Sequence, residues 1–289
     1  MAIAARTHDP GPYLSDRFSD VHVLRAGSQF TVYDAFEDAT RRRVALKVPD
    51  ANRTSWLCDV LRAEGRVLAA VGGHPNIVTL LQSFDLHDGR PALMLERCVG
   101  SLSDHLATDA RVSLQEAVAI GIKLAGALET VHTAGVLHCD VRPDNVLVSE
   151  YGEPVLAGFD EAVIDTSTAS RPPQHITTAH TAPELLEGAK PTPRTDVYGL
   201  GATLYELIAG RAAFREYAGE SAATVIVRVL SGRVKPIIAP DVPLEMSDLL
   251  TWAMAADPAQ RPPSPAWLAE ELRRMESREG WPRTRLLSA

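Results

Sequence analysis

The stretch HCDVRPDNVLV, residues 138–148, carries the side chains of this sequence that are best suited to chemistry. Asp140, Asp144 and Asn145 bring carboxylate and amide oxygens into a polar loop that is preceded by VL and followed by VLV. A surface turn is one interpretation of such a loop. The apolar flanks favour the other, a positioned catalytic loop. Lysine and asparagine are scarce in a chain rich in arginine, so Lys47 and Asn145 stand out from the background.

Length and charge restrict the classes of protein that this chain can belong to. Its 289 residues allow one large domain or two small ones, and the net charge of −8 argues against a nucleic-acid surface. Every apolar run is interrupted before it reaches membrane-spanning length, and the first residues lack the order of a secretory signal. Three scattered cysteines favour a reducing compartment. We therefore expect a soluble, cytoplasmic protein without a membrane segment.

Hydrophobic patterning changes from strand-like to helical along the chain. The N-terminal part alternates short apolar strands with turns and contains one helix, expected over 55–71. After residue 100 the signals are helical, with a capping box of Ser113 and Glu116 and a Ser264 cap followed by Pro265. The fold class expected is α+β, with a small antiparallel β lobe containing one helix, a larger mainly helical lobe and a ligand cleft between them.

Ordered motifs then identify a resemblance. The chain contains VALK, Glu64 in the following helix, HPNIV, HCDVRPDN, GFD, APE, TDVYGLG and DPAQRP, in this order. From about Val21 to Met275 it resembles the eukaryotic-like (Hanks-type) Ser/Thr protein kinase family, which implies a bilobal protein-kinase-like fold. The domains expected are an N-terminal extension over 1–20, an N-lobe over 21–97, a C-lobe over 98–276 and a tail over 277–289.

The resemblance implies ATP and magnesium (Mg²⁺) as cofactors and gives roles to the catalytic residues. Lys47 would contact the α- and β-phosphates and pair with Glu64. Asp140 would be the catalytic base, Asn145 a metal ligand, and Arg142, in place of the usual lysine, a group near the transferred phosphate. An exposed lysine at a strand end is the alternative for Lys47.

The resemblance also implies which residues surround the nucleotide. They are Leu24, Gly27, Val32, Ala45, Lys47, Glu96, Cys98 and Leu147. The phosphate-covering loop is degenerate, because its three glycine slots hold Arg25, Gly27 and Phe30. Without glycine, a Cβ obstructs the approach of backbone amides to phosphate. An ordinary β-hairpin is therefore as well supported as a phosphate clamp.

The metal-binding aspartate of the family is missing. Counting from Asn145, 158 − 145 = 13 places the slot at Gly158, and Phe159 fixes the register. An acid follows at Asp160. On an extended chain its side chain would lie about 6–7 Å away, too far for Mg²⁺ ligands held at about 2.0–2.1 Å. Asp160 can serve as a metal ligand only if Gly158 lets the backbone fold differently.

Five other positions complete the resemblance. Cys139 replaces an arginine that binds a phosphorylated activation loop, so activity is expected not to depend on phosphorylation of Thr166, Ser167, Thr168 or Ser170. Thr177 matches the substrate-loop threonine. The remaining three residues are structural: Glu184 is expected to pair with Arg261, and Asp196 to anchor the backbone of the catalytic loop.

Three functions remain open. The first is an ATP-dependent Ser/Thr protein kinase of atypical or reduced activity, acting on a protein substrate. The second is a pseudokinase, a nucleotide-binding or protein-docking module with a signalling partner, favoured by the changes at Arg25, Phe30, Cys139 and Gly158. The third is a small-molecule phosphotransferase, suggested by the text GFDEA but opposed by the C-terminal motifs.

Overall fold

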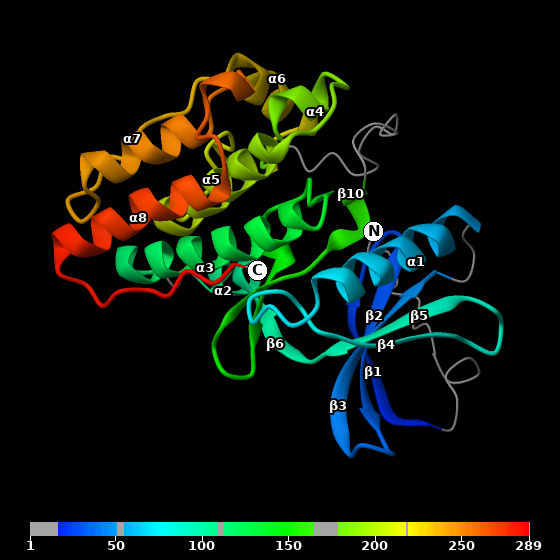
Figure 1. The fold of residues 1–289 in the computed structure, drawn as a ribbon. Coiled ribbons are helices and arrows are strands. Elements are labelled where there is room, and N and C mark those ends of the chain that lie inside the picture. The colour runs from blue at the N-terminus through cyan, green and yellow to red at the C-terminus, as the bar shows by residue number, and fades with distance from the viewer. Residues whose placement is uncertain (1–16, 51–54, 109–111, 165–178, 218, 289) are drawn as a thin grey trace. The chain divides into compact units, whose positions relative to one another are not determined.

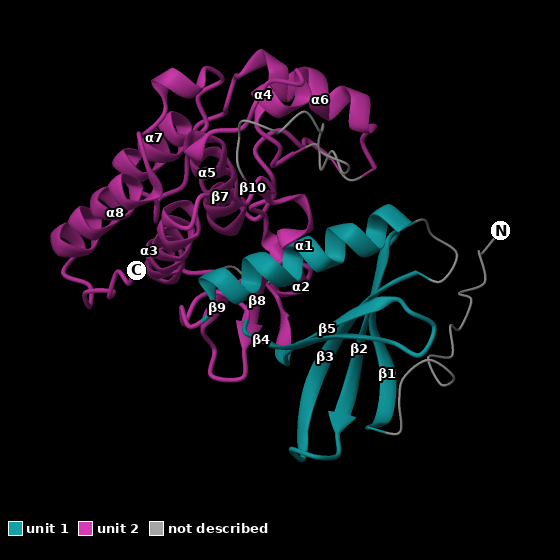
Figure 2. Ribbon diagram, turned by 45° about the vertical axis from the view of Figure 1, so that its right-hand side comes forward, with its two compact units in different colours: residues 1–72, 79–98 teal, residues 73–78, 99–289 magenta. Residues whose placement is uncertain are grey.

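The computed structural model describes residues 17–50, 55–108, 112–164, 179–217 and 219–288. The chain divides into two compact units, drawn in two colours in Figure 2. Unit 1 contains residues 1–72 and 79–98, and unit 2 contains residues 73–78 and 99–289. Each unit is described below by itself.

Unit 1 is built on an antiparallel five-stranded sheet in the order β1-β2-β3-β5-β4 (Figure 1). Its strands are β1 (Phe18–Ala26), β2 (Phe30–Glu37), β3 (Arg42–Pro49), β4 (Leu80–Asp85) and β5 (Pro91–Glu96). Side chains alternate between the two faces. Val44, Leu46 and Val48 of β3 join a buried apolar cluster on one face, which leaves Lys47 on the other.

The single helix of the described part of unit 1, α1 (Ser55–Val71), covers the face that carries Lys47. It has the predicted bounds, and its predicted apolar stripe, including Leu57, Leu61 and Leu68, is buried. The backbone of α1 approaches the sheet closely, because a Cβ on Gly65 would lie 2.9 Å from Leu93 Cδ2. Leu93 is the cross-strand partner of Lys47. The helix therefore brings its residues next to Lys47.

Unit 2 is mainly helical (Figure 1). Its helices are α2 (Leu102–Leu106), α3 (Leu114–Thr133), α4 (Pro183–Leu186), α5 (Pro193–Ala209), α6 (Ala222–Ser231), α7 (Leu244–Ala253) and α8 (Pro265–Glu279). Ser113 and Glu116 form the predicted capping box of α3. Its stripe of Val118, Ile122, Ala125 and Leu128 is fully buried. Ser264 caps α8, with Pro265 in the first turn, as predicted.

Unit 2 also contains short strands and turns, some of which flank the polar loop. They are β6 (Cys98–Ser101), β7 (Val136–Leu137), η1 (Pro143–Asn145), β8 (Val146–Ser149), β9 (Pro154–Leu156), η2 (Phe159–Glu161), β10 (Val163–Ile164) and η3 (Pro258–Gln260). The sheets pair β10 with β7, and β6 with β8 and β9. Residues 138–145 therefore connect β7, which pairs with β10, to β8, which pairs with β6 and β9. The apolar residues seen on both sides of the loop in the sequence form β7 and β8.

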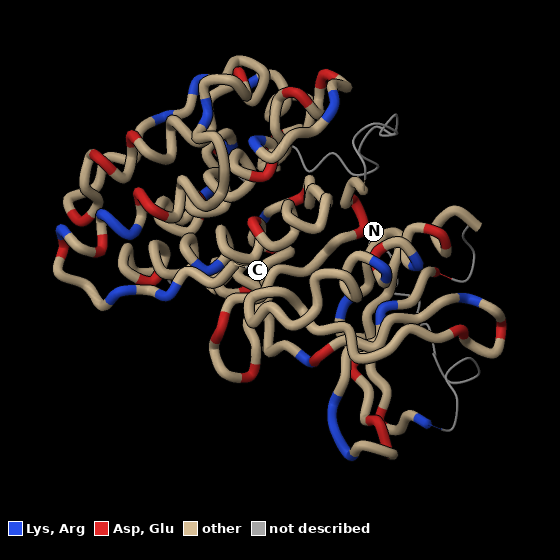
Figure 3. The backbone as a smooth tube through the Cα atoms, viewed as in Figure 1, with Lys and Arg blue, Asp and Glu red and all other residues tan. Residues whose placement is uncertain are grey.

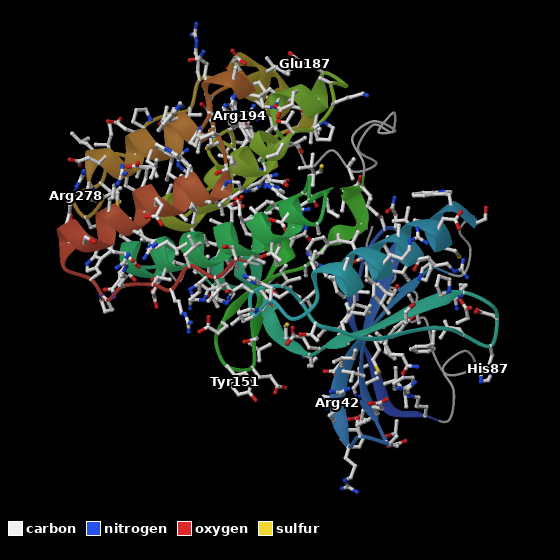
Figure 4. The ribbon with its side chains drawn as sticks, viewed as in Figure 1. Arg42, His87, Tyr151, Glu187, Arg194 and Arg278 are labelled. Carbon is white, nitrogen blue, oxygen red and sulfur yellow. The ribbon has the colours of Figure 1, made fainter. Side chains whose placement is uncertain are left out.

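The α+β class predicted from the sequence is confirmed, with an antiparallel sheet in unit 1 and helices in unit 2. Within the described residues, no helix combines the length and the apolar character needed to span a membrane. Basic and acidic residues are interspersed along the backbone of both units (Figure 3). Tyr151, at the turn between β8 and β9, projects from the ribbon and is 92% exposed (Figure 4).

Candidate active site

In unit 1, Lys47 and Glu64 form a buried ion pair. The distance between Lys47 Nζ and Glu64 Oε2 is 2.7 Å, and the side chains are 11% and 2% exposed. Lys47 comes from β3 and Glu64 from α1, which packs on the same face of the sheet. A buried ion pair is an inefficient way to stabilise a fold, because removing both charges from water costs about as much as their attraction returns. Its presence therefore favours a function for Lys47.

An aromatic ring lies next to this lysine. Lys47 Nζ is 4.7 Å from the centroid of the Phe30 ring, which is a cation–π geometry. Phe30 faces the same side of the sheet because Val32, its neighbour by alternation, is the cross-strand partner of Lys47. Phe30 fills the third glycine slot of the family motif. The sequence showed that glycine was absent but gave no sign that the ring covers Lys47.

The turn that joins β1 to β2 is closed tightly at its one retained glycine. The Gly27 N–H donates to Phe30 O at 2.9 Å. A Cβ on Gly27 would lie 2.8 Å from the same oxygen. Gly27 is therefore required by the hairpin itself. This geometry supports the hairpin interpretation of the loop and does not exclude a phosphate contact.

The residues predicted to surround a nucleotide fall into both units. Leu24 is 44% exposed, Ala45 is 7% exposed and Cys98 is 6% exposed. Val32 and Glu96 are half-buried in unit 1, and Glu96 Oε1 accepts from the Thr79 N–H at 2.7 Å. Leu147 is half-buried on β8 of unit 2. Their contact with a nucleotide stays a prediction.

In unit 2, the backbone that precedes Asp140 is held by a buried carboxylate from α5. Asp196 is 1% exposed and accepts from the His138 N–H at 2.9 Å and from the Cys139 N–H at 2.7 Å. The His132 Nε2 lies 2.7 Å from the same carboxylate. Cys139 has a φ of 65°, a left-handed conformation that costs energy for a residue with a side chain. Asp196 therefore anchors a strained turn, as predicted from the sequence.

Two pKa values near this turn are displaced in opposite directions. Burial opposes ionisation of Asp196, but the hydrogen bond from His132, the charges of His132 and His138 and a backbone N–H outweigh it and lower its pKa. Burial, together with the negative charges of Asp196, Glu161 and Asp140, raises the pKa of the Cys139 thiol well above its usual value. The thiol therefore stays protonated and cannot replace a cation.

The two polar residues of the loop are joined directly. Asn145 Nδ2 donates to Asp140 O at 2.9 Å and to Asp140 Oδ2 at 2.7 Å. The turn η1 places Asn145 so that its amide reaches back across the loop. One amide thus fixes both the backbone and the carboxylate of Asp140. The arrangement holds Asp140 in one position; its role as the catalytic base stays a prediction.

Arg142 pairs with an acid of its own loop. Its Nη2 donates to Asp144 Oδ2. Within the described residues its buried Nε has no hydrogen-bond acceptor. A guanidinium has five N–H donors, so the hydrogen bond to Asp144 leaves others to contact a phosphate, and the role of Arg142 beside a transferred phosphate stays a prediction.

The segment that follows β9 is not extended. Gly158 has φ 74° and ψ 51°, in the left-handed region, and the short 3-10 turn η2 begins directly after it with Phe159 and Asp160. The extended spacing of 158 and 160 assumed in the sequence argument is thus wrong, because glycine adopts a backbone that other residues disfavour. The condition under which Asp160 could serve as a metal ligand, a refolded backbone at Gly158, is present. Its binding of metal stays a prediction.

Asn145 fills part of the space beside Gly158. A Cβ on Gly158 would lie 2.5 Å from both Asn145 Cγ and Asn145 Oδ1. Any side chain at 158 therefore requires Asn145 to move. The missing aspartate and the hydrogen bonds of Asn145 to Asp140 are two parts of one local arrangement.

The donor set fits Mg²⁺ only in part. Asn145 Oδ1 is an oxygen that the hydrogen bonds of the amide nitrogen leave available, whereas residue 158 supplies no carboxylate. Mg²⁺ is usually held by one or two carboxylates plus substrate phosphates and water. No group of three or more His, Cys, Asp and Glu within the described ranges is arranged to hold a metal by itself. A metal here would be held by Asn145, with Asp160 as the candidate carboxylate, and by phosphates.

Outside the loop, Glu184 and Arg261 form the expected pair. Arg261 Nη1 and Nη2 donate to the two oxygens of Glu184, each at 2.7 Å, and both side chains are buried. Arg261 also donates to the backbone oxygens of Arg194, Ala255 and Ala256. This network ties the start of α4 to the segment before α8. The threonines and serines of the activation loop lie outside the described residues: Thr166, Ser167, Thr168, Ser170 and Thr177.

The fold and this constellation define the class of a protein kinase domain, and comparison with known proteins agrees. The protein kinase domain family model matches residues 18–272. The chain belongs to this family, which confirms the Hanks-type resemblance seen in the motifs.

Relatives with curated names are Ser/Thr protein kinases. The chain is 36% identical over 279 residues to Ser/Thr protein kinase PknK of Mycobacterium bovis, covering 94% of this chain and 25% of that protein. It is 30% identical over 258 residues to the probable Ser/Thr protein kinase CPE1738 of Clostridium perfringens, covering 87% and 37%. With PknA of Mycobacterium tuberculosis it shares 29% identity over 260 residues, covering 87% and 59%. The chain thus spans about a quarter of the length of PknK.

Proposed function

We propose that this chain is an ATP-dependent Ser/Thr protein kinase domain that transfers phosphate to a protein hydroxyl at a reduced rate. The observation that carries the proposal is the buried pair of Lys47 and Glu64, 2.7 Å apart. Membership of the protein kinase domain family and the named relatives support it. The reduced rate is inferred from Gly158, because a lost metal ligand removes several kcal/mol of charge stabilisation.

Each residue has a defined part in the proposal. Asp140 orients the acceptor hydroxyl and takes its proton at the carboxylate, which Asn145 holds in place. Lys47 binds the α- and β-phosphates of ATP, and Glu64 orients Lys47. Arg142 lies near the transferred phosphate once it releases Asp144. When bound, Mg²⁺ supplies positive charge to the phosphates, and Asn145 and Asp160 are the residues that would hold it.

A pseudokinase is the second candidate. The observation that favours it is the ring of Phe30, whose centroid lies 4.7 Å from Lys47 Nζ, because an apolar ring beside the ammonium competes with phosphates for contact with it. Gly158 adds to this, since no carboxylate replaces the missing ligand at that position. In this candidate the chain binds a protein partner without turnover. A small-molecule phosphotransferase has less support, because the Glu184–Arg261 pair follows the protein kinase motifs.

Two measurements on one set of proteins distinguish the candidates. The first is thermal unfolding with ATP, with and without MgCl₂. The second is transfer of radiolabelled γ-phosphate to a protein acceptor by the wild type and by Asp140→Asn. We expect a magnesium-dependent rise in the unfolding midpoint and a loss of transfer of at least about 100-fold in Asp140→Asn.

The matched control is Asp85→Asn, which removes a carboxylate that is 62% exposed on β4 and leaves the loop intact. It should transfer phosphate at the wild-type rate. Transfer that persists equally in Asp140→Asn contradicts the kinase proposal. No transfer by the wild type together with no metal dependence supports the pseudokinase. The protein substrate or signalling partner, and a cytoplasmic location, stay predictions.

A further inference from the structure

The residues that follow α8 run along α3 within unit 2. The last turn of α8 ends at Gly280, which has a φ of 71°, and the Trp281 N–H then donates to Glu276 O at 2.9 Å. In Figure 1 this red segment extends beside α3 toward the C label, and Figure 2 places the C label beside α3 as well. We call residues 281–288 the tail segment. Its path raises the question of what holds it.

A buried carboxylate of α8 holds the first part of the tail segment. Glu276 is 2% exposed, and its two oxygens accept from the Thr284 N–H at 3.2 Å and 3.0 Å. A hydrogen bond from a backbone N–H to a carboxylate is stronger than a neutral one. The bond uses the backbone of Thr284, so it fixes the course of the chain without regard to the side chain at that position.

The end of the tail segment lies directly on the backbone of α3. A Cβ on Gly126 would be 2.0 Å from Leu287 O and 3.2 Å from Leu286 Cδ1. Such an approach is possible only because residue 126 has no side chain. Glycine in the middle of a helix lowers helix stability relative to alanine. Packing of the tail segment against residue 126 explains why a glycine occurs in the middle of this helix.

The same carbonyl reaches the segment 73–78. His74 Nε2 lies 3.0 Å from Leu287 O, and His74 Nδ1 accepts from the Asn76 N–H at 3.1 Å. Both bonds are satisfied by the neutral imidazole with its proton on Nε2. The histidine thus joins the tail segment to a turn that also includes the Ile77 N–H and His74 O, 3.1 Å apart.

We propose that the surface formed by Gly126 and His74 is an intramolecular docking site whose occupant is the tail segment, and that docking fastens residues 73–78. These residues follow α1, the helix that carries Glu64, along the chain. Residues 73–78 also donate the Val78 N–H to Leu156 O at 2.9 Å, next to the strand that precedes Gly158. The tail segment is therefore a latch, by which we mean a segment whose docking holds residues 73–78, which follow α1 in the sequence and are hydrogen-bonded to β9.

The test is a thermal-unfolding cycle with two changes, Gly126→Ala and a chain that ends at Gly280. Truncation lowers the unfolding midpoint when Gly126 is retained, because the contacts of residues 281–288 are lost. In the Gly126→Ala background truncation has a smaller effect, because the added Cβ has already displaced Leu287 and only the Thr284–Glu276 hydrogen bonds remain to be lost. In the truncated chain, Gly126→Ala raises the midpoint by about 2 °C, because alanine favours helix and meets no tail.

The opposite pattern overturns the proposal. If truncation lowers the midpoint equally in both backgrounds, or in neither, the tail segment is not seated on Gly126. A pair of full-length variants covers the case in which the truncated chain fails to fold. Thr284→Pro removes the N–H that Glu276 accepts and lowers the midpoint, whereas the matched Thr284→Ala keeps the N–H and the wild-type midpoint. Equal midpoints for the two variants contradict the latch.

Amide hydrogen exchange reports on the fastening itself. Loss of the tail segment speeds exchange of the Asn76 and Ile77 amides, because the turn that contains them loses the hydrogen bond between His74 and Leu287 O. The buried amides of Leu200 and Leu204 in α5 are the control and keep their exchange rates. Unchanged exchange rates at Asn76 and Ile77 would contradict the claim that the tail segment holds residues 73–78 in place. Thermal unfolding and hydrogen exchange need neither ATP nor turnover. A result that contradicts the latch proposal is therefore distinct from one that contradicts the proposed kinase function.

Discussion

At the scale of single residues, the glycine at position 158 and the position of the Asn145 side chain depend on each other. The family slot for a metal-binding aspartate holds a glycine in a left-handed conformation, and the amide of Asn145 lies where a side chain would begin. From there Asn145 donates to Asp140. The glycine at 158 therefore coincides with hydrogen bonds that hold Asp140 in place. This arrangement supports our proposal of activity at a reduced rate.

Gly158→Ala tests the close contact. We expect it to lower the free energy of unfolding by about 2–4 kcal/mol, from about 1–2 kcal/mol for the left-handed backbone and the rest for overlap with Asn145. Gly152→Ala is the matched control, because Gly152 has a φ of 78° and nothing within 4 Å of an added Cβ. Urea unfolding measures both. Equal losses in the two variants would show that Asn145 does not restrict residue 158.

Phe30 and Lys47 form a second pair at this scale. A cation–π contact with the ring centroid 4.7 Å from Nζ predicts a coupling of about 0.5–1 kcal/mol in the free energy of unfolding. A double-mutant cycle of Phe30→Leu and Lys47→Met in urea measures this coupling, since leucine keeps most of the apolar volume. Strictly additive losses would mean that the ring does not stabilise the ammonium.

At the scale of elements, α5 positions the polar loop. It brings Asp196 to the His138 and Cys139 N–H groups, which hold the turn from which Asp140 extends. The α5 helix is itself held by the network around Glu184 and Arg261, because Thr195 of α5 donates to Glu184 at 2.8 Å. The motifs TDVYGLG, APE and DPAQRP are thus parts of one support for the loop.

The lowered pKa of Asp196 gives this support a pH dependence. A carboxyl whose pKa is lower in the folded state stabilises the fold fully above its unfolded pKa of about 3.9 and loses that contribution as the pH falls through the folded pKa. At pH 7, Asp196→Asn should cost about 3 kcal/mol of the free energy of unfolding, because it disturbs buried donors. The difference from wild type should shrink as the pH falls below about 4.

Urea unfolding between pH 7 and pH 3 measures this difference. Asp241→Asn, at an exposed position, is the control and should follow the wild type throughout. A gap between Asp196→Asn and the wild type that is constant with pH would contradict the assignment.

Helix bounds and helix caps could be predicted from the sequence more accurately than contacts between side chains. The bounds of α1, the capping box of α3 and the cap of α8 follow from local signals such as apolar spacing and Ser or Pro at a helix start. The ring of Phe30 over Lys47 and the tail segment on Gly126 could not be predicted. Both depend on which residues a sheet register or a packed helix brings together, and this information is not local in the sequence.

The pairings that the sequence did predict came from whole motifs. Glu184 with Arg261 and Asp196 with the loop backbone were expected because each residue stood in a family motif with a known counterpart. The backbone at Gly158 was missed in its details, because an extended chain was assumed where a left-handed glycine and a 3-10 turn occur. The glycine itself was the available signal.

At the scale of the whole molecule, the residues to which we propose catalytic roles belong to two units. Lys47 and Glu64 lie in unit 1, and Asp140, Asn145 and Asp160 lie in unit 2. The protein kinase domain family model extends across both. The central claim is therefore that the chain transfers the γ-phosphate of ATP by a mechanism that requires Lys47 and Asp140 together.

The most direct test of this claim is the kcat/KM of γ-phosphate transfer by wild type, Lys47→Met, Asp140→Asn and the double variant. Residues that act as a unit lose activity non-additively, whereas independent residues give losses that multiply. We predict measurable transfer by the wild type, a loss of at least about 100-fold in each single variant and no further loss in the double variant. Transfer that is unchanged in Asp140→Asn, or losses that multiply in the double variant, would contradict the claim.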